Sequence, residues 1–202
     1  MKASASSLSY TDTLREARDW VMNLFKKHHQ PCLHYHNLGH TQQVVDRSFA
    51  IAQHYQLHRT ECAILEIAAW FHDTGHLFSP TLGHEEVGVA RFQEFLEAYS
   101  INEIPADTII ACILATKMPQ RPASFLEAII CDADTYHLGT PYFAITDALL
   151  KKEVAERTGS ILMDWEAKTL ELLRTHRYHT FFCQSQLEAG KQFNYEQYAA
   201  NA

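Results

Sequence analysis

The segment ECAILEIAAWFHDTGH, residues 61–76, says more about the fold of this chain than any other stretch. Between Cys62 and Phe71 it is apolar on nearly every side of a helix, with Glu66 as the exception. A helix that is apolar all round is buried, so we predict a central helix over about residues 59–73. His72 and Asp73 stand at its end, where ionisable groups are costly to bury without a partner. The segment therefore predicts a buried helix whose last turn carries a polar site.

Helical periodicity extends over almost the whole chain. Apolar residues recur at intervals of three and four, and no stretch alternates as a strand would. Proline and glycine separate the periodic segments, and residues 74–83 are expected to form a loop. We expect an all-α helical bundle in one domain, residues 1–202, with a motif-bearing core at about 30–140 and the helices of 141–202 packed on it. Later helices are expected near residues 84–99, 106–117, 123–137, 141–157 and 160–187.

Two helix starts can be placed from capping residues. Thr13-x-x-Glu16 is a capping box, which predicts a first helix that runs to about His29. Asn37 is a good N-cap for the second helix. That second helix is expected to turn four apolar side chains inward: Val44, Val45, Phe49 and Ala52.

Composition limits the classes of function. The 202 residues are 47% hydrophobic and 20% charged, which is ordinary for a globular chain. A formal net charge of -7 without a basic tract argues against binding of a nucleic-acid polymer. Five widely spaced cysteines without a CxxC pair indicate reduced thiols in a cytoplasmic protein. The first ten residues lack an apolar signal segment and the longest apolar run is too short to span a bilayer, so no membrane association is expected.

Four polar positions fall on core-facing surfaces. His40 lies one turn before Val44, while His72 and Asp73 close the central helix. Asp134 follows Ile130 by four residues, on the apolar side of its segment, and no lysine or arginine lies near either aspartate in sequence. Two imidazoles and two carboxylates suit one divalent cation, which can be Mn, Fe, Co, Ni, Zn or Mg.

Three motifs carry a resemblance to a known family. YHNLGH opens a helix, FHDTGH closes an apolar one and CDADTYHLG ends another, in the order H, HD, D. From about Tyr35 to Gly139 the sequence resembles the HD superfamily of metal-dependent phosphohydrolases, most closely its small bacterial members. The resemblance implies an all-helical bundle with the metal between central helices. It also favours Asp134 over Asp132 as the fourth ligand, although Asp132 too follows an apolar position at a spacing of three.

Further histidines have open roles. The YHNxxH pattern is similar to that of cyclic-nucleotide phosphodiesterases, which implies that His36 is a proton donor; the alternative is a loop histidine bonded to backbone. His76 would bind phosphate, donate a proton or ligate a second metal. The resemblance to binuclear relatives implies that His84 is an extra metal ligand or a substrate contact. The alternative is that His84 is a solvated residue at the start of a helix.

The count of metals is expected to be one. Binuclear relatives supply another histidine after the following helix, but that region here reads ATKMPQRP, residues 115–122, and has none. Lys117 or Arg121 would then bind phosphate, against the alternative that each is a solvated residue at a helix end.

These residues together predict an enzyme. The expected reaction is the metal-dependent hydrolysis of a small phosphate ester, such as a nucleotide, with Asp73, His36 and His76 as catalytic residues. Two other classes remain open: an HD-type di-iron oxygenase, which needs two metals, and a metal-bound module that senses a ligand without catalysis.

Overall fold

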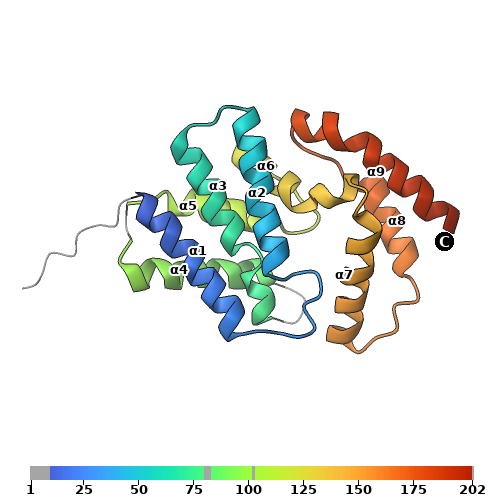
Figure 1. Ribbon diagram of the computed structural model, residues 1–202, viewed down its shortest axis with the longest axis horizontal. Coiled ribbons are helices and arrows are strands. Elements are labelled where there is room, and N and C mark those ends of the chain that lie inside the picture. Colours follow the sequence, from blue (N-terminus) through green and yellow to red (C-terminus); the bar gives the residue numbers. More distant parts are fainter. Residues whose placement is uncertain (1–9, 80–82, 102, 202) are drawn as a thin grey trace, which may run out of the picture.

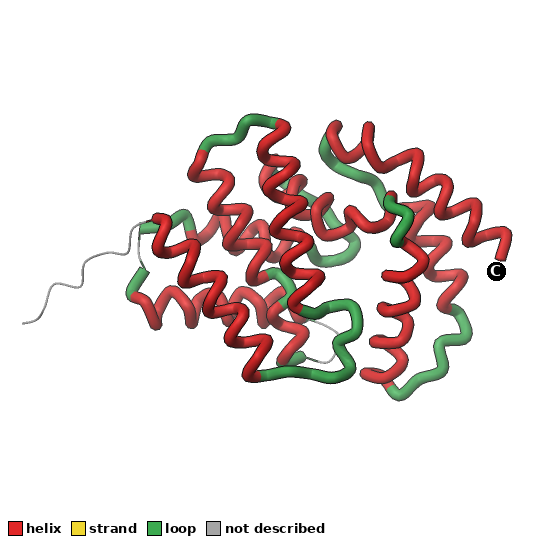
Figure 2. The backbone as a smooth tube through the Cα atoms, viewed as in Figure 1, coloured by secondary structure: helices red, strands yellow, loops and turns green. Residues whose placement is uncertain are grey.

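The computed structural model describes residues 10–79, 83–101 and 103–201, and within these ranges the chain is helical with no strand (Figure 2). The prediction of an all-α fold is confirmed. The elements in chain order are α1 (Tyr10–Lys27), α2 (Leu38–His54), α3 (Arg59–Phe71), the 3₁₀ helix η1 (Thr74–Leu77), α4 (His84–Tyr99), α5 (Ala106–Ala115), α6 (Phe125–Asp134), the 3₁₀ helix η2 (Thr135–Gly139), α7 (Phe143–Thr158), α8 (Trp165–Thr175) and α9 (Phe181–Asn201).

Helix α3 is the centre of the bundle, as its composition predicts. All residues from Ala63 to Phe71 except Glu66 are buried. The helix packs against α1, α2 and α5 (Figure 1). His58 and Glu61 form a capping box at its first turn, since the Glu61 carboxylate accepts the His58 N–H at 2.9 Å. The buried helix therefore ends with His72 and Asp73 inside the protein.

Helix α2 begins where Asn37 predicts. The Asn37 side-chain oxygen accepts the N–H groups of Gly39 at 2.8 Å and His40 at 3.2 Å. Val44 and Ala52 are fully buried, but the prediction for Phe49 is wrong because its side chain is 54% exposed. At 100° per residue Phe49 lies about 140° round the helix from Val44, so it faces solvent.

The predicted capping box of Thr13 and Glu16 is wrong. Helix α1 begins at Tyr10, so Thr13 lies inside it and is buried on the face that also carries Ala17 and Val21. A spacing of four places these three side chains in one row, which explains why Thr13 is an interior residue and not a cap.

The predicted single helix over 160–187 is wrong. Helix α8 ends at Thr175 and α9 begins at Phe181, with an extended segment between them. The Asp132 carboxylate holds this segment, because it accepts the backbone N–H groups of His179 and Thr180 and the Thr180 hydroxyl, each at 2.7 Å. A contact with α6 therefore ends the helix where the sequence contains no proline or glycine.

Helices α7, α8 and α9 lie together on one side of α1–α6 (Figure 1). Helix α9 crosses η2 closely: a Cβ atom on Gly190 would overlap the backbone of Gly139. Asn194 strengthens the contact by donating to the carbonyls of Leu138 and Thr140, both at 2.9 Å. Among the described helices, none combines the length and apolarity that crossing a membrane requires.

Candidate metal centre

Four side chains converge at the end of α3, and they come from α2, from the junction of α3 with η1 and from the end of α6. His40 Nε2 lies 3.2 Å from Asp73 Oδ2 and 3.2 Å from Asp134 Oδ1. His72 Nε2 lies 3.2 Å from Asp73 Oδ2 and 3.7 Å from Asp134 Oδ1. The ligand atoms of His40, His72 and Asp134 all fall within 4.8 Å of one another, a grouping that could hold a metal ion. The structure thus brings together the four residues that the sequence singled out.

The hydrogen bonding of this centre fits a cation. His72 is fully buried and Asp73 is 4% exposed, yet His72 Nε2 and Asp73 Oδ2 have no hydrogen-bond partner among the described residues. Buried polar atoms are almost always paired, because leaving one unpaired costs about 1–3 kcal/mol. The other ring nitrogen, His72 Nδ1, lies 2.8 Å from the Ala69 carbonyl and donates to it. That bond leaves Nε2 as the lone-pair nitrogen, the form in which histidine binds a metal.

The electrostatics of the centre fit a cation as well. Burial by itself would lower the pKa values of His40 and His72, but close contact with the negative carboxylates of Asp73 and Asp134 outweighs it and raises both. Burial would raise the pKa of each aspartate, but the two imidazoles hold both values below the ordinary range. The carboxylates therefore recruit positive charge, and a divalent ion can replace the protons that otherwise supply it.

The two candidate aspartates of α6 have different partners. Asp132 is fully buried and its oxygens are used by the segment before α9. Asp134 faces His40 and accepts a long contact of 3.5 Å from Gln120 Nε2. The choice of Asp134 over Asp132 for the centre therefore agrees with the geometry.

A second group of histidines surrounds the other oxygen of Asp73. His76 Nε2 and His84 Nε2 lie 3.9 and 3.8 Å from Asp73 Oδ1. The His76 ring is sandwiched between His36 and His84, with ring centroids 3.9 and 3.8 Å apart. His36, Asp73 and His76 form a second grouping that could hold a metal. The sequence favoured a single site because residues 115–122 lack a histidine, but the structure supplies these ligand atoms from other segments.

Arg157 of α7 determines which ring nitrogen of His76 carries the proton. Its Nη1 donates to His76 Nδ1 at 2.9 Å, and its guanidinium also bonds the carbonyl of Ser79. Burial first, and then the charge of His36, lower the pKa of His76, so its ring is neutral. A neutral ring that accepts at Nδ1 carries its proton on Nε2. In this arrangement His76 presents an N–H toward Asp73, as a donor does, instead of a lone pair.

Glu153 of α7 holds His36. The carboxylate is 1% exposed, accepts the backbone N–H groups of Tyr35 at 2.9 Å and His36 at 3.0 Å, and lies 2.6 Å from His36 Nδ1. His36 is therefore bound to a carboxylate and not, as the alternative had it, through its ring to backbone. Sequence reasoning missed Glu153 and Arg157, because an acid and a base four residues apart on a helix normally form a solvated pair.

Glu153 gives a pH-dependent prediction. Burial by itself would raise its pKa, but the hydrogen bond and charge of His36 and the two backbone N–H groups outweigh it and lower the value from 4.5 to about 2. The resulting stability is present above pH 4.5 and is lost as the pH falls toward 2. Glu153→Gln should therefore lower the free energy of unfolding by about 3 kcal/mol at pH 7, and by much less near pH 2.

Urea denaturation at several pH values measures this difference. Glu97→Gln, on the exposed surface of α4, is the matched control and should show no such pH dependence. If the free energies of unfolding of wild type and Glu153→Gln differ by the same amount from pH 7 to pH 2, the Glu153 carboxylate is not stabilised by these partners.

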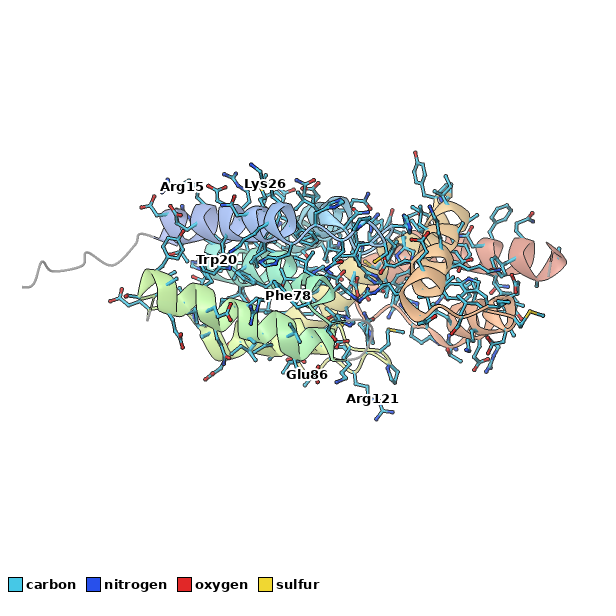
Figure 3. The ribbon with its side chains drawn as sticks, turned by 90° about the horizontal axis from the view of Figure 1, so that it is seen from below. Arg15, Trp20, Lys26, Phe78, Glu86 and Arg121 are labelled. Carbon is cyan, nitrogen blue, oxygen red and sulfur yellow. The ribbon has the colours of Figure 1, made fainter. Side chains whose placement is uncertain are left out.

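A cavity of about 260 Å³ opens beside the centre. Its walls include His36, Asp73, His84, Lys117 and Asp134. Lys117 pairs with Glu86 on an exposed surface, so it is a residue of the rim. Arg121 is exposed, is not among the described residues that line this cavity and projects away from the helices (Figure 3). The structure does not place Arg121 at the site, because the segment after Lys117 turns its side chain to solvent.

Helix α4 reaches the centre through a close backbone approach. The segment predicted as a loop over 74–83 instead forms η1 in residues 74–77; residues 80–82 lie outside the described part of the chain. A Cβ atom on Gly75 would overlap the backbone carbonyl of His84. This contact brings His84 to Asp73.

Gly75→Ala should therefore destabilise the fold by about 1–3 kcal/mol and move His84 away from the centre, because the clash is with backbone that cannot rotate aside. Gly39→Ala is the control: its Cβ would lie 3.0 Å from one side-chain atom, the Asn37 capping oxygen, and would meet no backbone, so a destabilisation of about 1 kcal/mol or less is expected. Urea denaturation compares the two. A Gly75→Ala variant as stable as wild type would contradict the close approach.

Comparison with known proteins identifies no relative of this chain. No family model matches the chain, and neither a curated protein nor a solved structure matches it significantly. The function is therefore inferred from the geometry of the centre itself.

Proposed function

We propose that this chain is a metal-dependent phosphohydrolase of the HD superfamily that hydrolyses a small phosphate ester, such as a nucleotide. The observation that supports it most is the convergence of two imidazoles and two carboxylates at the buried end of α3, with His72 Nε2 and Asp73 Oδ2 unpaired. The adjoining 260 Å³ cavity supports the proposal too, because its lining includes Asp73 and Asp134 of this set together with His36.

The proposed ligands of the ion are His40, His72, Asp73 and Asp134. A divalent cation in such a set lowers the pKa of a coordinated water from about 15.7 toward about 7 and polarises a phosphoryl oxygen. The buried positions of both histidines fix their rings, so the protein holds its ligands in place before the ion arrives.

His36 is the proposed proton donor to the leaving oxygen. Its Nδ1 is held by the buried Glu153 carboxylate at 2.6 Å, which leaves Nε2 to give a proton within the cavity. A positioned general acid of this kind contributes about 10² to 10⁴ in rate. Glu153 acts through His36 and is a positioning residue.

Lys117 is the proposed phosphate contact. It lies at the rim of the cavity and carries a positive charge, which suits phosphoryl oxygens. His76 lies behind the cavity wall, stacked between His36 and His84, and directs its Nε2 N–H toward Asp73. His84 completes the wall on the side of α4.

A second candidate function is oxygen chemistry at a pair of metals. It is favoured by the second grouping of His36, Asp73 and His76, because Asp73 turns one oxygen toward each group. The hydrogen bond from Arg157 to His76 Nδ1 weighs against it, since a ring that accepts there has no lone pair on Nε2.

Metal analysis followed by a substrate panel tests the proposal. Purified protein should contain close to one divalent ion per chain, and should hydrolyse at least one of p-nitrophenyl phosphate, bis-p-nitrophenyl phosphate, nucleoside monophosphates and cyclic nucleotides. Two irons per chain with oxygen consumption would favour the second candidate. Bound metal without turnover of any ester would favour a ligand-sensing module.

A further inference from the structure

A third carboxylate, that of Glu85, belongs to the wall of the cavity at the metal centre. Glu85 is the second residue of α4, is 4% exposed and lines this cavity together with Asp73 and Asp134. His84 Nε2 lies 3.3 Å from Glu85 Oε1 and 3.8 Å from Asp73 Oδ1, so one imidazole separates the two carboxylates. The wall therefore carries one carboxylate more than the proposed ion uses.

The charge of Glu85 has no cationic side chain of its own. Within residues 10–79, 83–101 and 103–201, no lysine or arginine forms an ion pair with Glu85, and Lys117 in the same wall is paired with Glu86. The ring of His84 does not balance it, because His84 Nδ1 is buried without an acceptor among the described residues and an imidazolium would leave an unpaired N–H there. The partial positive charge at the start of α4 offsets the carboxylate only in part.

The charges at the loaded centre leave no positive surplus. The two carboxylate ligands match the two charges of the proposed ion, and Glu153 and Arg157 pair with each other at 3.1 Å. The proton that His36 would donate adds one positive charge, which Glu85 matches. A phosphomonoester carries close to two negative charges at neutral pH, whereas a phosphodiester carries one. The second charge of a monoester therefore gains no attraction at this centre and lies near the Glu85 carboxylate.

We propose, on the basis of the hydrolysis proposed above, that the site takes phosphodiesters in preference to phosphomonoesters and that Glu85 sets this preference. Glu85 is a specificity-determining residue whose charge acts through space, so a side chain that is 4% exposed still repels a second anionic oxygen in the cavity. Met118 lines the same cavity and is 51% exposed. It offers an apolar surface to the second alcohol group, which only a diester has.

Calorimetric titration of the metal-loaded chain with two inert analogues tests the proposal. Phenylphosphonate carries two negative charges above neutral pH, and methylphenylphosphinate, in which a methyl group replaces one oxygen, carries one. Wild type should bind the phosphinate at least about tenfold more tightly than the phosphonate. In Glu85→Gln at equal metal content, the affinity for the phosphonate relative to the phosphinate should rise about tenfold, because one negative charge has left the wall.

Two further variants separate the local charge from the net charge. Glu97→Gln removes the same charge from an exposed position about 18 Å further along α4 and should keep the wild-type preference. Glu85→Asp retains the carboxylate and should keep the preference as well. Tighter binding of the phosphonate to wild type, no binding of either analogue, or an unchanged preference in Glu85→Gln would overturn the inference.

The binding result is distinguishable from the outcome of the ester panel. A preference for the phosphinate that depends on Glu85, in a protein that hydrolyses no ester, would support the charge selection and contradict the proposed hydrolysis. Hydrolysis of a monoester together with tighter binding of the phosphonate would support the hydrolysis and overturn the role of Glu85.

Discussion

Asp73→Ala is expected to lose most of its bound metal and roughly 10³-fold or more in ester hydrolysis, because several kcal/mol of transition-state stabilisation depend on the ion. Asp73 Oδ2 lies 3.2 Å from both His40 Nε2 and His72 Nε2, so its removal leaves two imidazoles facing Asp134 alone. Metal content per chain and turnover on the best ester of the panel measure the loss.

The helical bundle should survive this substitution. Asp73 lies between α3 and η1, inside neither helix, and its Oδ2 has no hydrogen-bond partner among the described residues, so circular dichroism should be unchanged. Asp46→Ala, at an exposed position of α2, is the control and should keep both metal and activity. An Asp73→Ala protein with undiminished metal and full activity would show that Asp73 is not a ligand.

His36→Ala is expected to keep its metal but to lose about 10² to 10⁴ in turnover on an ester with a poor leaving group. The four proposed ligands remain, while the donor held by Glu153 at 2.6 Å is gone. A good leaving group such as p-nitrophenolate needs little protonation, so the loss on it should be far smaller. Steady-state rates on an alkyl and a nitrophenyl ester of the same phosphate give the comparison.

The control for this experiment is His29→Ala, an exposed histidine beyond the end of α1, which should behave as wild type on both esters. An equal loss on both esters in His36→Ala would assign the proton to His76 or to a coordinated water. No loss on either would make His36 a structural residue held by Glu153.

The local features of the fold follow from the sequence because they depend on neighbours a few residues apart. The apolar run from Cys62 to Phe71 makes α3 the central helix, and the Asn37 side chain caps α2. Thr13 misled the same reasoning, since a residue type that caps a helix can also pack inside one. Propensity could not locate the break between α8 and α9, because a buried carboxylate on α6, Asp132, creates it.

The sequence by itself singled out the four residues of the proposed ligand set, with the family resemblance needed to choose Asp134 over Asp132. His40, His72, Asp73 and Asp134 are ionisable groups on apolar faces, and a buried charge without a sequence neighbour to pair with demands a distant partner. The tertiary structure decided everything that surrounds them. Glu153 and Arg157 look like an ordinary surface pair, yet the packing of α7 against the loop before α2 buries Glu153 beside His36.

The same distinction explains the stack of histidines at Asp73. His36, His76 and His84 are separated by up to 48 residues, and the His84 ring reaches His76 because Gly75 lets the start of α4 approach η1. Sequence reasoning counts ligands along the chain and so favoured one group of ligand atoms, whereas the structure forms a second group from two segments, the loop before α2 and the start of η1. Helix caps and apolar periodicity act over one or two turns, but the environment of a buried side chain is set by elements that only the folded chain brings into contact.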